Sequence, residues 1–295
     1  MSAFWALHQS KGISALAIAS ISFGTSAIFV RFATEATALS LTFFRLSLAA
    51  IVMFLFAYQR KALITLTRKQ VVLVALAGLV LSLHFLTFIL AVKFTTVANA
   101  TFLVNTSPVM LAVLAPIMIK ERTTSRESIG VITATIGVLF VANAGNGFRY
   151  FSLADASALL AAFLISLYTM LGRSLRTQGV STACYTAYVY STAAIVGLSL
   201  AEMFGSNMFR AYDTTNLVAI LGLAIVPTML GHSLYNYSLG SVKAVTANLF
   251  PLLEPIIASV FAVFLFREIP TITQLIGYSL ILIAVAVVVT SQSRT

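Results

Sequence analysis

Ten apolar runs, most of them about 20 residues long, follow one another along this 295-residue chain with short polar stretches between them. Such a run has the length of an α-helix that crosses the hydrocarbon core of a bilayer. No water bonds an exposed backbone there, so these runs can only be helices. The predicted spans cover 13–30, 38–58, 71–92, 97–119, 128–143, 154–174, 182–204, 216–239, 243–266 and 272–290. The predicted fold class is therefore all-α, a polytopic membrane protein with ten transmembrane helices.

Composition supports the same conclusion. Hydrophobic residues make up 60% of the chain, charged residues make up 9%, and the mean hydropathy is +1.01. A soluble domain carries about 25% charged residues because its surface must be hydrated. The net charge of +10 could suggest nucleic acid, but the chain has no polar domain to present a basic surface. Loops that face anionic lipid explain the charge, and we expect no nucleic-acid partner.

The sequence offers little for covalent chemistry. Cys184 is the only cysteine, which excludes a disulfide within the chain and a cysteine-based metal site. No span carries two His, Asp or Glu residues at the i, i+3 or i+4 spacing of a helix-borne metal site. The chain also lacks a glycine-rich phosphate loop, a nucleophile elbow and paired acid–base carboxylates. We therefore predict no metal, no cofactor and no enzymatic activity.

The first apolar run also has features of a signal peptide. Lys11 precedes it, and Ala36-Thr37-Ala38 fits a small-x-small cleavage pattern. The run is long for a signal peptide, and it has a counterpart in the second half of the chain. We therefore predict that 13–30 is a retained transmembrane helix.

Basic residues between the spans indicate the orientation. With the N-terminus inside, the cytoplasmic segments hold twelve basic residues: Lys11, Arg60, Lys61, Arg68, Lys69, Lys120, Arg122, Arg126, Arg173, Arg176, Lys243 and Arg294. The opposite side holds five: Arg31, Lys93, Arg149, Arg210 and Arg267. Short cytoplasmic loops are enriched in Lys and Arg, so both termini are predicted to be cytoplasmic. The predicted location is the cytoplasmic (inner) membrane of a bacterium.

Two segments 147 residues apart share a series of motifs. In each, a proline-bearing helix ends in a basic–acidic pair, followed by a short polar turn and an Ile-Gly helix. The pairs are Pro108 with Pro255, Lys120-Glu121 with Arg267-Glu268, Thr124 with Thr271, and Ile129-Gly130 with Ile276-Gly277. The halves 1–147 and 148–295 each contain five spans, an odd number, so the second half enters the membrane inverted. Inverted repeats of this kind build transporters that open a midplane cavity to alternate sides.

Three further motifs give the chain a family resemblance: Phe43-Phe44-Arg45 in the second span, Asn105-Thr106-Ser107-Pro108 in the fourth, and Leu253-Glu254-Pro255 in the ninth. Over nearly its whole length the chain resembles the ten-helix EamA-type members of the drug/metabolite transporter superfamily. Within that superfamily it is similar to the YddG-type exporters of aromatic and other neutral amino acids. The resemblance implies two inverted five-helix halves around a central cavity, with the fifth and tenth helices on the periphery.

Two charged residues, Arg45 and Glu254, lie well away from the ends of their spans, where a central charge costs about 2.5–3.5 kcal/mol. Arg45 either anchors a substrate carboxylate or ties helices together through backbone carbonyls or Glu254. The tie is the favoured interpretation, because an arginine shared by transporters of different substrates suits a scaffold. Glu254 either serves proton coupling or binding of a substrate ammonium group, or is a buried hydrogen-bond hub opposite the Asn105–Ser107 region.

Prolines flank the glutamate. Each proline removes a helix N–H and frees a carbonyl, which must then bond to a side chain, a water or the substrate. The predicted structural and gating residues are Arg45, Pro108, Pro251 and Pro255.

Polar and aromatic residues lie deep in several spans. One stripe of the eighth span carries four polar residues, which favours the lining of a cavity over contact with another helix. His84 stands alone on its helix, which favours a histidine satisfied within the core. Tyr185, near a helix start, fits the interfacial aromatic belt, whereas Tyr168 is too deep for it. The predicted substrate-binding residues are His84, Asn105, Tyr168, Thr228, His232, Tyr235, Asn236 and Glu254.

Aromatic faces beside hydroxyl and amide groups suit a substrate with an apolar body and a polar end. The predicted function is export of small metabolites, foremost aromatic and other neutral amino acids, by alternating access. We expect a monomer whose partners are the amino-acid substrate and membrane lipids. Two alternatives stay open: a multidrug or cation pump or lipid-type flippase on the same fold, for which Glu254 would be the membrane glutamate, and a membrane-embedded enzyme.

Overall fold

The computed structural model describes residues 2–95, 97–143, 152–267 and 269–292, and every regular element in these ranges is a helix. The helices of the first half are α1 (Ser2–Phe23), α2 (Ser26–Phe32), α3 (Ala38–Gln59), α4 (Arg68–Phe94), α5 (Val97–Val104), α6 (Ser107–Met118) and α7 (Ser125–Asn143). Those of the second half are α8 (Leu153–Thr177), α9 (Thr182–Met203), α10 (Thr214–Leu223), η1 (Ala224–His232), α11 (Ser233–Ser238), α12 (Ala244–Leu249), η2 (Phe250–Leu253), α13 (Glu254–Phe266) and α14 (Ile272–Gln292).

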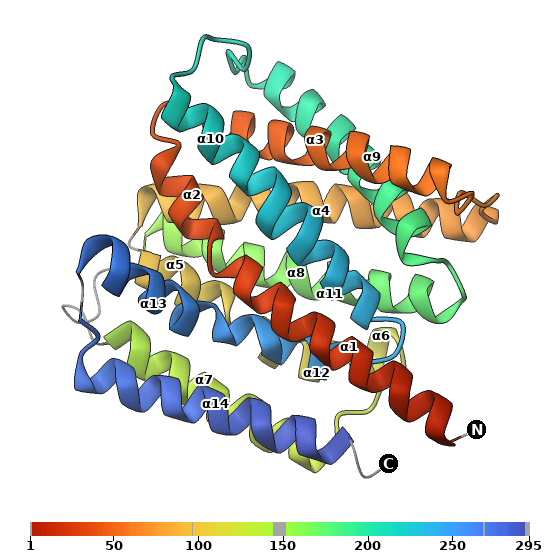
Figure 1. Cartoon of the computed structure of the whole chain (residues 1–295), viewed down its shortest axis with the longest axis vertical. Helices are drawn as coiled ribbons and strands as arrows, with labels where there is room; N and C mark the ends of the chain where they lie inside the picture. Colours follow the sequence, from red (N-terminus) through yellow and green to blue (C-terminus); the bar gives the residue numbers. More distant parts are fainter. Residues whose placement is uncertain (1, 96, 144–151, 268, 293–295) are drawn as a thin grey trace.

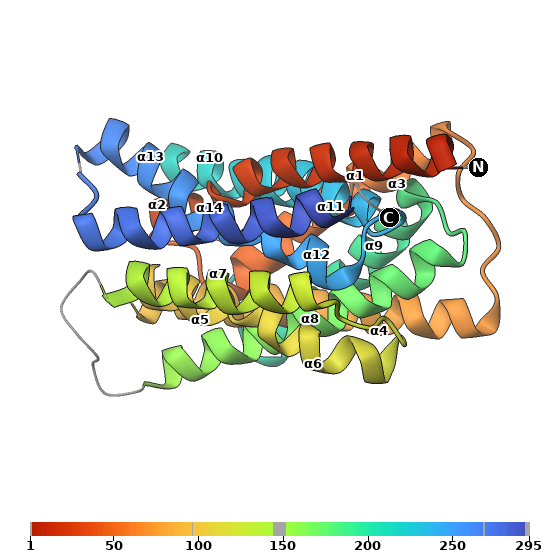
Figure 2. The ribbon, with the colours of Figure 1, turned by 90° about the horizontal axis from the view of Figure 1, so that it is seen from below.

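Nine helical stretches among the described residues are long and apolar enough to cross a membrane. Helix α7 has 19 residues, covers the fifth predicted span, 128–143, and runs beside α14 in both views (Figures 1 and 2). The prediction of an all-α polytopic membrane protein is confirmed. Helices α7 and α14 lie together at one edge of the bundle in Figure 1.

Four of the membrane-spanning stretches are interrupted near their middle. Helix α1 gives way to α2 at Gly24 and Thr25, and α5 gives way to α6 at Asn105 and Thr106. At each of the first two breaks a threonine hydroxyl donates to a carbonyl of the preceding turn, Thr25 to Ser22 O at 2.7 Å and Thr106 to Leu103 O at 2.7 Å. These bonds satisfy backbone oxygens that the interrupted helix no longer pairs.

Prolines account for the other two interruptions. Pro227 lies in the π-helix η1, and Pro251 lies in the 3₁₀-helix η2. A proline has no N–H to donate to the carbonyl four residues before it, which for Pro227 is Leu223 O. The Thr228 hydroxyl donates to that oxygen at 2.7 Å. Beside η2, the Ser20 hydroxyl donates to Phe250 O at 2.8 Å, so a side chain from the far end of the chain holds this break.

Positions 147 residues apart have the same local geometry. Lys120 and Arg267 both have φ of 57°, the left-handed conformation that often ends a helix. Thr124 caps α7 by a reciprocal pair of bonds with Glu127. Its counterpart Thr271 caps α14 in the same way with Gln274, which is the position equivalent to Glu127. The sequence similarity between the two segments therefore extends to how their helices end and begin.

Helices α7 and α14 pack antiparallel through glycines. A Cβ on Gly137 would lie 2.7 Å from Gly277 O, and a Cβ on Gly277 would lie 2.5 Å from Gly137 O. Gly130 faces Val288, and the equivalent positions Gly277 and Val141 face each other as well. Close backbone approach at small residues is the usual means of helix association in lipid.

The bundle has two chemically different ends. Both termini lie at the end where α3 joins α4, α6 joins α7, α8 joins α9 and α11 joins α12, on the right in Figures 1 and 2. We call this the basic end, because its described residues include Lys11, Arg60, Lys61, Arg68, Lys69, Lys120, Arg122, Arg126, Arg173, Arg176 and Lys243.

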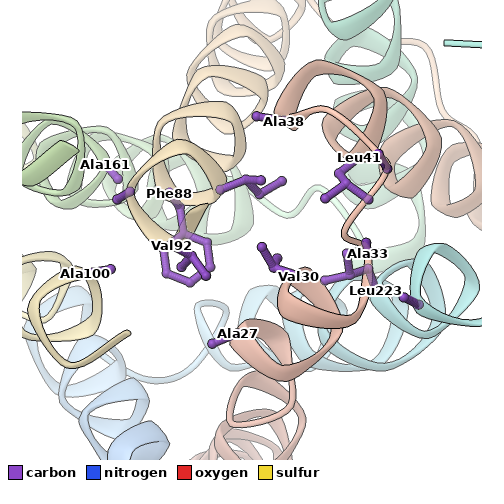
Figure 3. Packing of buried hydrophobic residues seen from close by; sticks show 14 of the residues in the cluster. Ala27, Val30, Ala33, Ala38, Leu41, Phe88, Val92, Ala100, Ala161 and Leu223 are labelled. Carbon is purple, nitrogen blue, oxygen red and sulfur yellow. The ribbon is translucent and has the colours of Figure 1, made fainter. Parts of the chain in front are cut away.

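At the opposite end, buried apolar side chains pack together. Figure 3 shows Val30 and Ala33, at the end of α2, packed near Leu41 of α3 and facing Phe88 and Val92 near the end of α4. We call this group the apolar cluster; it also includes residues of α5, α8 and α10. Burial of these side chains holds the ends of α2 and α4 together, and Lys93 Nζ of α4 also donates to Ala33 O at 2.9 Å.

Candidate functional site

A cavity lies where the four interrupted stretches meet. The volume of the cavity that the centre of a water molecule can occupy is ≈ 70 Å³. Its lining residues are Phe23, Ser26, Arg45, His84, Phe85, Phe88, Val104, Asn105, Ser107, Ile165, Pro227, His232, Tyr235, Asn248, Pro251 and Glu254. Of the predicted substrate-binding residues, the structure brings together His84, Asn105, His232, Tyr235 and Glu254. The helix breaks therefore place their polar residues around one cavity.

Arg45 reaches this cavity from α3. It is 1% exposed, its Nε donates to the Thr228 hydroxyl at 3.0 Å, and its guanidinium lies 3.6 Å from the centre of the Phe85 ring. Its Nη1 atom is buried and has no hydrogen-bond partner in the described structure. A scaffolding Arg45 was predicted to bond to backbone carbonyls or to Glu254. Its side-chain partners in the described structure are instead the Thr228 hydroxyl and the Phe85 ring.

Glu254 is the first residue of α13 and is 7% exposed. Its Oε1 atom is buried and unpaired within the described residues, where no ion pair joins it to Arg45. The N-terminus of a helix favours a negative charge, which lowers the cost of a carboxylate at this position. Two groups that can carry opposite charge thus line the same cavity without bonding each other.

The two histidines have different environments. His84 Nδ1 lies 2.9 Å from Ala161 O, so this nitrogen carries the proton and donates to the carbonyl. His232 Nδ1 has no partner among the described residues. The His232 ring is packed edge-on against Phe23 at 4.8 Å and Phe85 at 4.9 Å between ring centres. His84 is thus held by the backbone, whereas His232 has a free polar atom in an aromatic surrounding.

Asn105 also has a free donor, since its Nδ2 atom is buried and unpaired in the described structure. The neighbouring polar side chains, by contrast, are satisfied by one another. The Tyr235 hydroxyl donates to Asn248 Oδ1 at 3.2 Å and lies 2.8 Å from the Thr169 hydroxyl. Asn248 Nδ2 in turn donates to the Ser107 hydroxyl at 2.8 Å.

Sequence reasoning missed Asn248. This residue, and not Glu254, is the hydrogen-bond hub that faces Ser107. Its signal was present in the sequence, because Asn248 is an amide inside an apolar span, six residues before Glu254. The phenylalanines that line the cavity, Phe23, Phe85 and Phe88, were also missed. They are among 22 phenylalanines in the chain, so their type alone gave no signal.

Three predicted binding residues lie beside the cavity and do not line it. Thr228 is occupied by Arg45 and by Leu223 O. Asn236 donates to the Tyr168 hydroxyl at 2.6 Å and to His232 O at 2.7 Å. The Tyr168 ring centre lies 6.2 Å from that of His232, so it supports the histidine from behind. The four polar residues predicted to share one stripe of the eighth span therefore do not all face the cavity: His232 and Tyr235 line it, and Thr228 and Asn236 do not. The reason is that η1 is a π-helix, which changes the angular spacing of the residues on this face.

The remaining predicted residues divide in the same way. Pro251 lines the cavity, whereas Pro108 and Pro255 are buried near it without lining it.

The expectation that Tyr185 lies at the membrane interface is wrong, because its side chain is 0% exposed and packs beside Tyr168. Within the ranges that the structure describes, no three His, Cys, Asp or Glu side chains gather as a metal site.

Comparisons with known proteins agree with this architecture. The sequence model of the EamA-like transporter family matches residues 10–143 and 152–290. An uncharacterized transporter of Archaeoglobus fulgidus is 25% identical over 277 residues, which cover 91% of this chain and 94% of that protein. A probable terminal-alkyne amino-acid exporter of Streptantibioticus cattleyicolor is 28% identical over 186 residues, which cover 62% of this chain and 60% of that protein. A solved crystal structure has a TM-score of 0.77 at 17% identity over 97% of each chain, which shows the same fold.

Proposed function

Because this chain belongs to the EamA-like transporter family, we propose that it exports small zwitterions, foremost aromatic and other neutral amino acids, through its central cavity. The protein acts in this proposal as a monomer in the cytoplasmic (inner) membrane of a bacterium. The observation that carries the proposal is the set of buried polar atoms that line one cavity and have no partner in the described structure. These atoms are Arg45 Nη1, Asn105 Nδ2, His232 Nδ1 and Glu254 Oε1.

The set matches the chemistry of a zwitterion. The guanidinium of Arg45 and the amide N–H of Asn105 are donors for a carboxylate, and the Glu254 carboxylate is an acceptor for an ammonium group. Leaving a buried charge unpaired is strongly unfavourable, so a ligand that pairs both charges gains from each. A ligand with one charge of each sign satisfies Arg45 and Glu254 at the same time.

Aromatic rings supply the apolar part of the proposed site. Phe23, Phe85 and Phe88 line the cavity beside His232, and an aromatic or aliphatic amino-acid side chain packs well against such rings. A transporter must also release its substrate, so modest affinity suffices. A millimolar dissociation constant corresponds to about 4 kcal/mol of binding free energy, which a few hydrogen bonds and one apolar contact supply. The probable amino-acid exporter among the relatives favours the same substrate class.

The transport mechanism we propose is alternating access between two inverted repeats, 1–147 and 148–295. The family model matches each half separately, and positions 147 residues apart share their helix ends, caps and glycine contacts. In this scheme the two halves exchange conformations and open the cavity to one side at a time. The interrupted helices are the hinges of the exchange, because each already lacks regular backbone pairing at the cavity.

In this proposal the basic end faces the cytoplasm, since short cytoplasmic loops are enriched in Lys and Arg. A cysteine at Arg68 in a Cys184→Ala protein tests this orientation. We expect an impermeant maleimide to label Arg68→Cys in everted vesicles and to leave it unlabelled in intact cells. A cysteine at Asp213, which lies at the opposite end and is exposed, should give the reverse pattern. Labelling of Arg68→Cys in intact cells would contradict the orientation.

A second candidate function is efflux of lipophilic cations. Glu254 favours it, because its carboxylate has no basic partner in the described structure and the cavity beside it is rich in aromatic rings. Cations bind both carboxylates and aromatic faces. Arg45 argues against it, since a buried guanidinium on the same cavity repels a cation that brings no anionic group.

Counterflow in proteoliposomes separates the two candidates. We expect vesicles loaded with unlabelled phenylalanine or threonine to accumulate the labelled amino acid and to ignore a lipophilic cation. His232→Ala, which removes a cavity-lining ring and its unpaired nitrogen, should reduce amino-acid flux about tenfold, the effect of losing about one hydrogen bond to a charged group. Ser199→Ala, on the exposed face of α9, is the matched control. Accumulation of the cation without any amino acid would reject the proposal.

A further inference from the structure

A group of charged side chains joins the two halves at the basic end. Glu121 follows α6, and its Oε1 accepts a bond from Arg173 Nε of α8 at 2.6 Å. Arg173 Nη1 also donates to Leu239 O at 2.7 Å, and Glu121 Oε2 accepts from the Ala244 N–H at 3.0 Å. The two side chains are only 16% and 19% exposed. This ion pair therefore binds the junction between α6 and α7 to both α8 and the connection between α11 and α12.

A second acidic residue makes a parallel connection. The Glu127 side chain on α7 is 0% exposed, and its Oε1 accepts from the Thr246 hydroxyl of α12 at 2.9 Å. Its Oε2 lies 3.5 Å from Lys243 Nζ. We call Glu121, Glu127, Arg173 and Lys243 the charged latch. Both acids belong to the first half of the chain, and both bases belong to the second half.

The charged latch lies just beyond the cavity on the basic side. Leu239, which Arg173 binds, is four residues past the cavity-lining Tyr235, or about 6 Å along a helix. Ala244, which Glu121 binds, is four residues before the cavity-lining Asn248. A path from the cavity to the basic end must therefore part the elements that the latch joins.

The opposite end has no buried ion pair in the part of the chain that the structure describes. Its ion pair, Arg210 with Glu35, is long at 3.4 Å, and its side chains are 46% and 36% exposed. Arg31, in the last turn of α2 at that end, is exposed and makes no ion pair with the described residues. The apolar cluster lies there, and two hydrogen bonds join the halves, from the Glu35 N–H to Asn216 Oδ1 at 3.0 Å and from the Thr95 hydroxyl to Asp155 Oδ1 at 3.0 Å. Among the described residues, buried ion pairs between the halves are thus confined to the basic end.

We propose that the charged latch is the gate of the basic end, and that its release opens the central cavity to that side. This inference rests on the proposed transport function, and it assigns the opening step to Glu121 and Arg173 as positioning residues. Substrate does not touch them. They set the balance between the two conformations, because their bonds exist only while the basic end is closed.

Accessibility of the cavity tests this gate without any substrate. The reporter is Ser26→Cys in a Cys184→Ala protein, because Ser26 lines the cavity and is 6% exposed. Reaction with an impermeant maleimide is measured from each side, in vesicles of both orientations. Arg173→Met should speed labelling from the basic side by roughly tenfold, the effect of losing about one charged hydrogen bond. Labelling from the opposite side should slow, because opening one end closes the other.

Glu121→Gln is the second variant, because it removes the charge while its amide oxygen still accepts the Ala244 N–H. Arg210→Ala is the matched control, since it breaks the ion pair of the opposite end. We expect Glu121→Gln to change labelling in the same direction as Arg173→Met, and Arg210→Ala to leave basic-side labelling unchanged.

Two results would overturn the gate. One is unchanged basic-side labelling in folded Glu121→Gln protein. The other is faster labelling from both sides, which would show that the latch residues only stabilise the fold. If Arg173→Met does not fold, Glu121→Gln alone decides between these outcomes. A failure to transport amino acids, with the expected change in labelling, would reject the proposed substrate and leave the gate intact.

Discussion

Glu254→Gln should abolish the preference of the protein for a free amino group. In the proposed complex the Glu254 carboxylate pairs with the substrate ammonium, in a cavity where its Oε1 has no other partner among the described residues. Removing one member of a buried, hydrogen-bonded charge pair costs roughly 2–5 kcal/mol. At 1.4 kcal/mol per factor of ten, phenylalanine counterflow at low concentration should fall by roughly 30-fold or more.

Two substrate analogues make this expectation sharp. Wild-type protein should reject N-acetylphenylalanine, which has no ammonium group, and Glu254→Gln should accept it about as well as phenylalanine. Arg45→Gln should show the complementary change, losing the preference for phenylalanine over phenylalaninamide, which has no carboxylate. Ser199→Ala again serves as the folded control. Wild-type rates and selectivity in folded Glu254→Gln would remove Glu254 from the binding site.

Gly277→Val should lower the thermal stability of the protein more than any change on the outer face of the same helix. A Cβ at Gly277 would lie 2.5 Å from Gly137 O, and this neighbour is backbone that no rotamer change can move aside. Overpacking of a close contact costs about 1–3 kcal/mol, and here α14 must separate from α7 to admit the side chain. We expect the midpoint of unfolding in detergent to fall by on the order of 5 °C.

The control for this prediction is Ala286→Val. Ala286 lies on α14 and is exposed, so a valine side chain at this position points away from α7. Thermal denaturation followed by size-exclusion chromatography measures both variants. Equal midpoints for Gly277→Val and Ala286→Val would show that the contact between the two glycines does not hold α7 to α14.

The sequence predicted the fold well because lipid leaves few choices. Long apolar runs in a bilayer must be helices, so the spans could be located from hydropathy alone. The form of the helix interruptions was harder to predict. The eighth span, 216–239, was predicted as one continuous helix, whereas Ala224–His232 within it form a π-helix that contains Pro227. That form depends on Thr228 bonding to Leu223 O and to Arg45, which are contacts made by the folded protein.

The candidate site was predicted in part for a related reason. Glu254 and His232 stood out because a polar group in a membrane span needs an explanation. Both line the cavity. Asn236 stood out equally, yet it bonds to Tyr168 behind the cavity. Spacing along a helix shows which residues share a face. It does not show whether that face meets a cavity or another helix.

Equivalent cap positions in the two similar segments also indicate how two similar halves can make the two ends of a transporter differ. Glu127 and Gln274 occupy equivalent positions, and each caps its helix through the same reciprocal bonds with a threonine. Capping requires only the side-chain oxygen that both residues have. Glu127 carries a negative charge that pairs with Lys243, whereas Gln274 is neutral. Glutamate and glutamine at this position make the same capping bonds, but only the glutamate can pair with a lysine by charge, and it does so at the basic end. Selection on such cap positions would then act on the polarity of transport, with the stability of either half left unchanged.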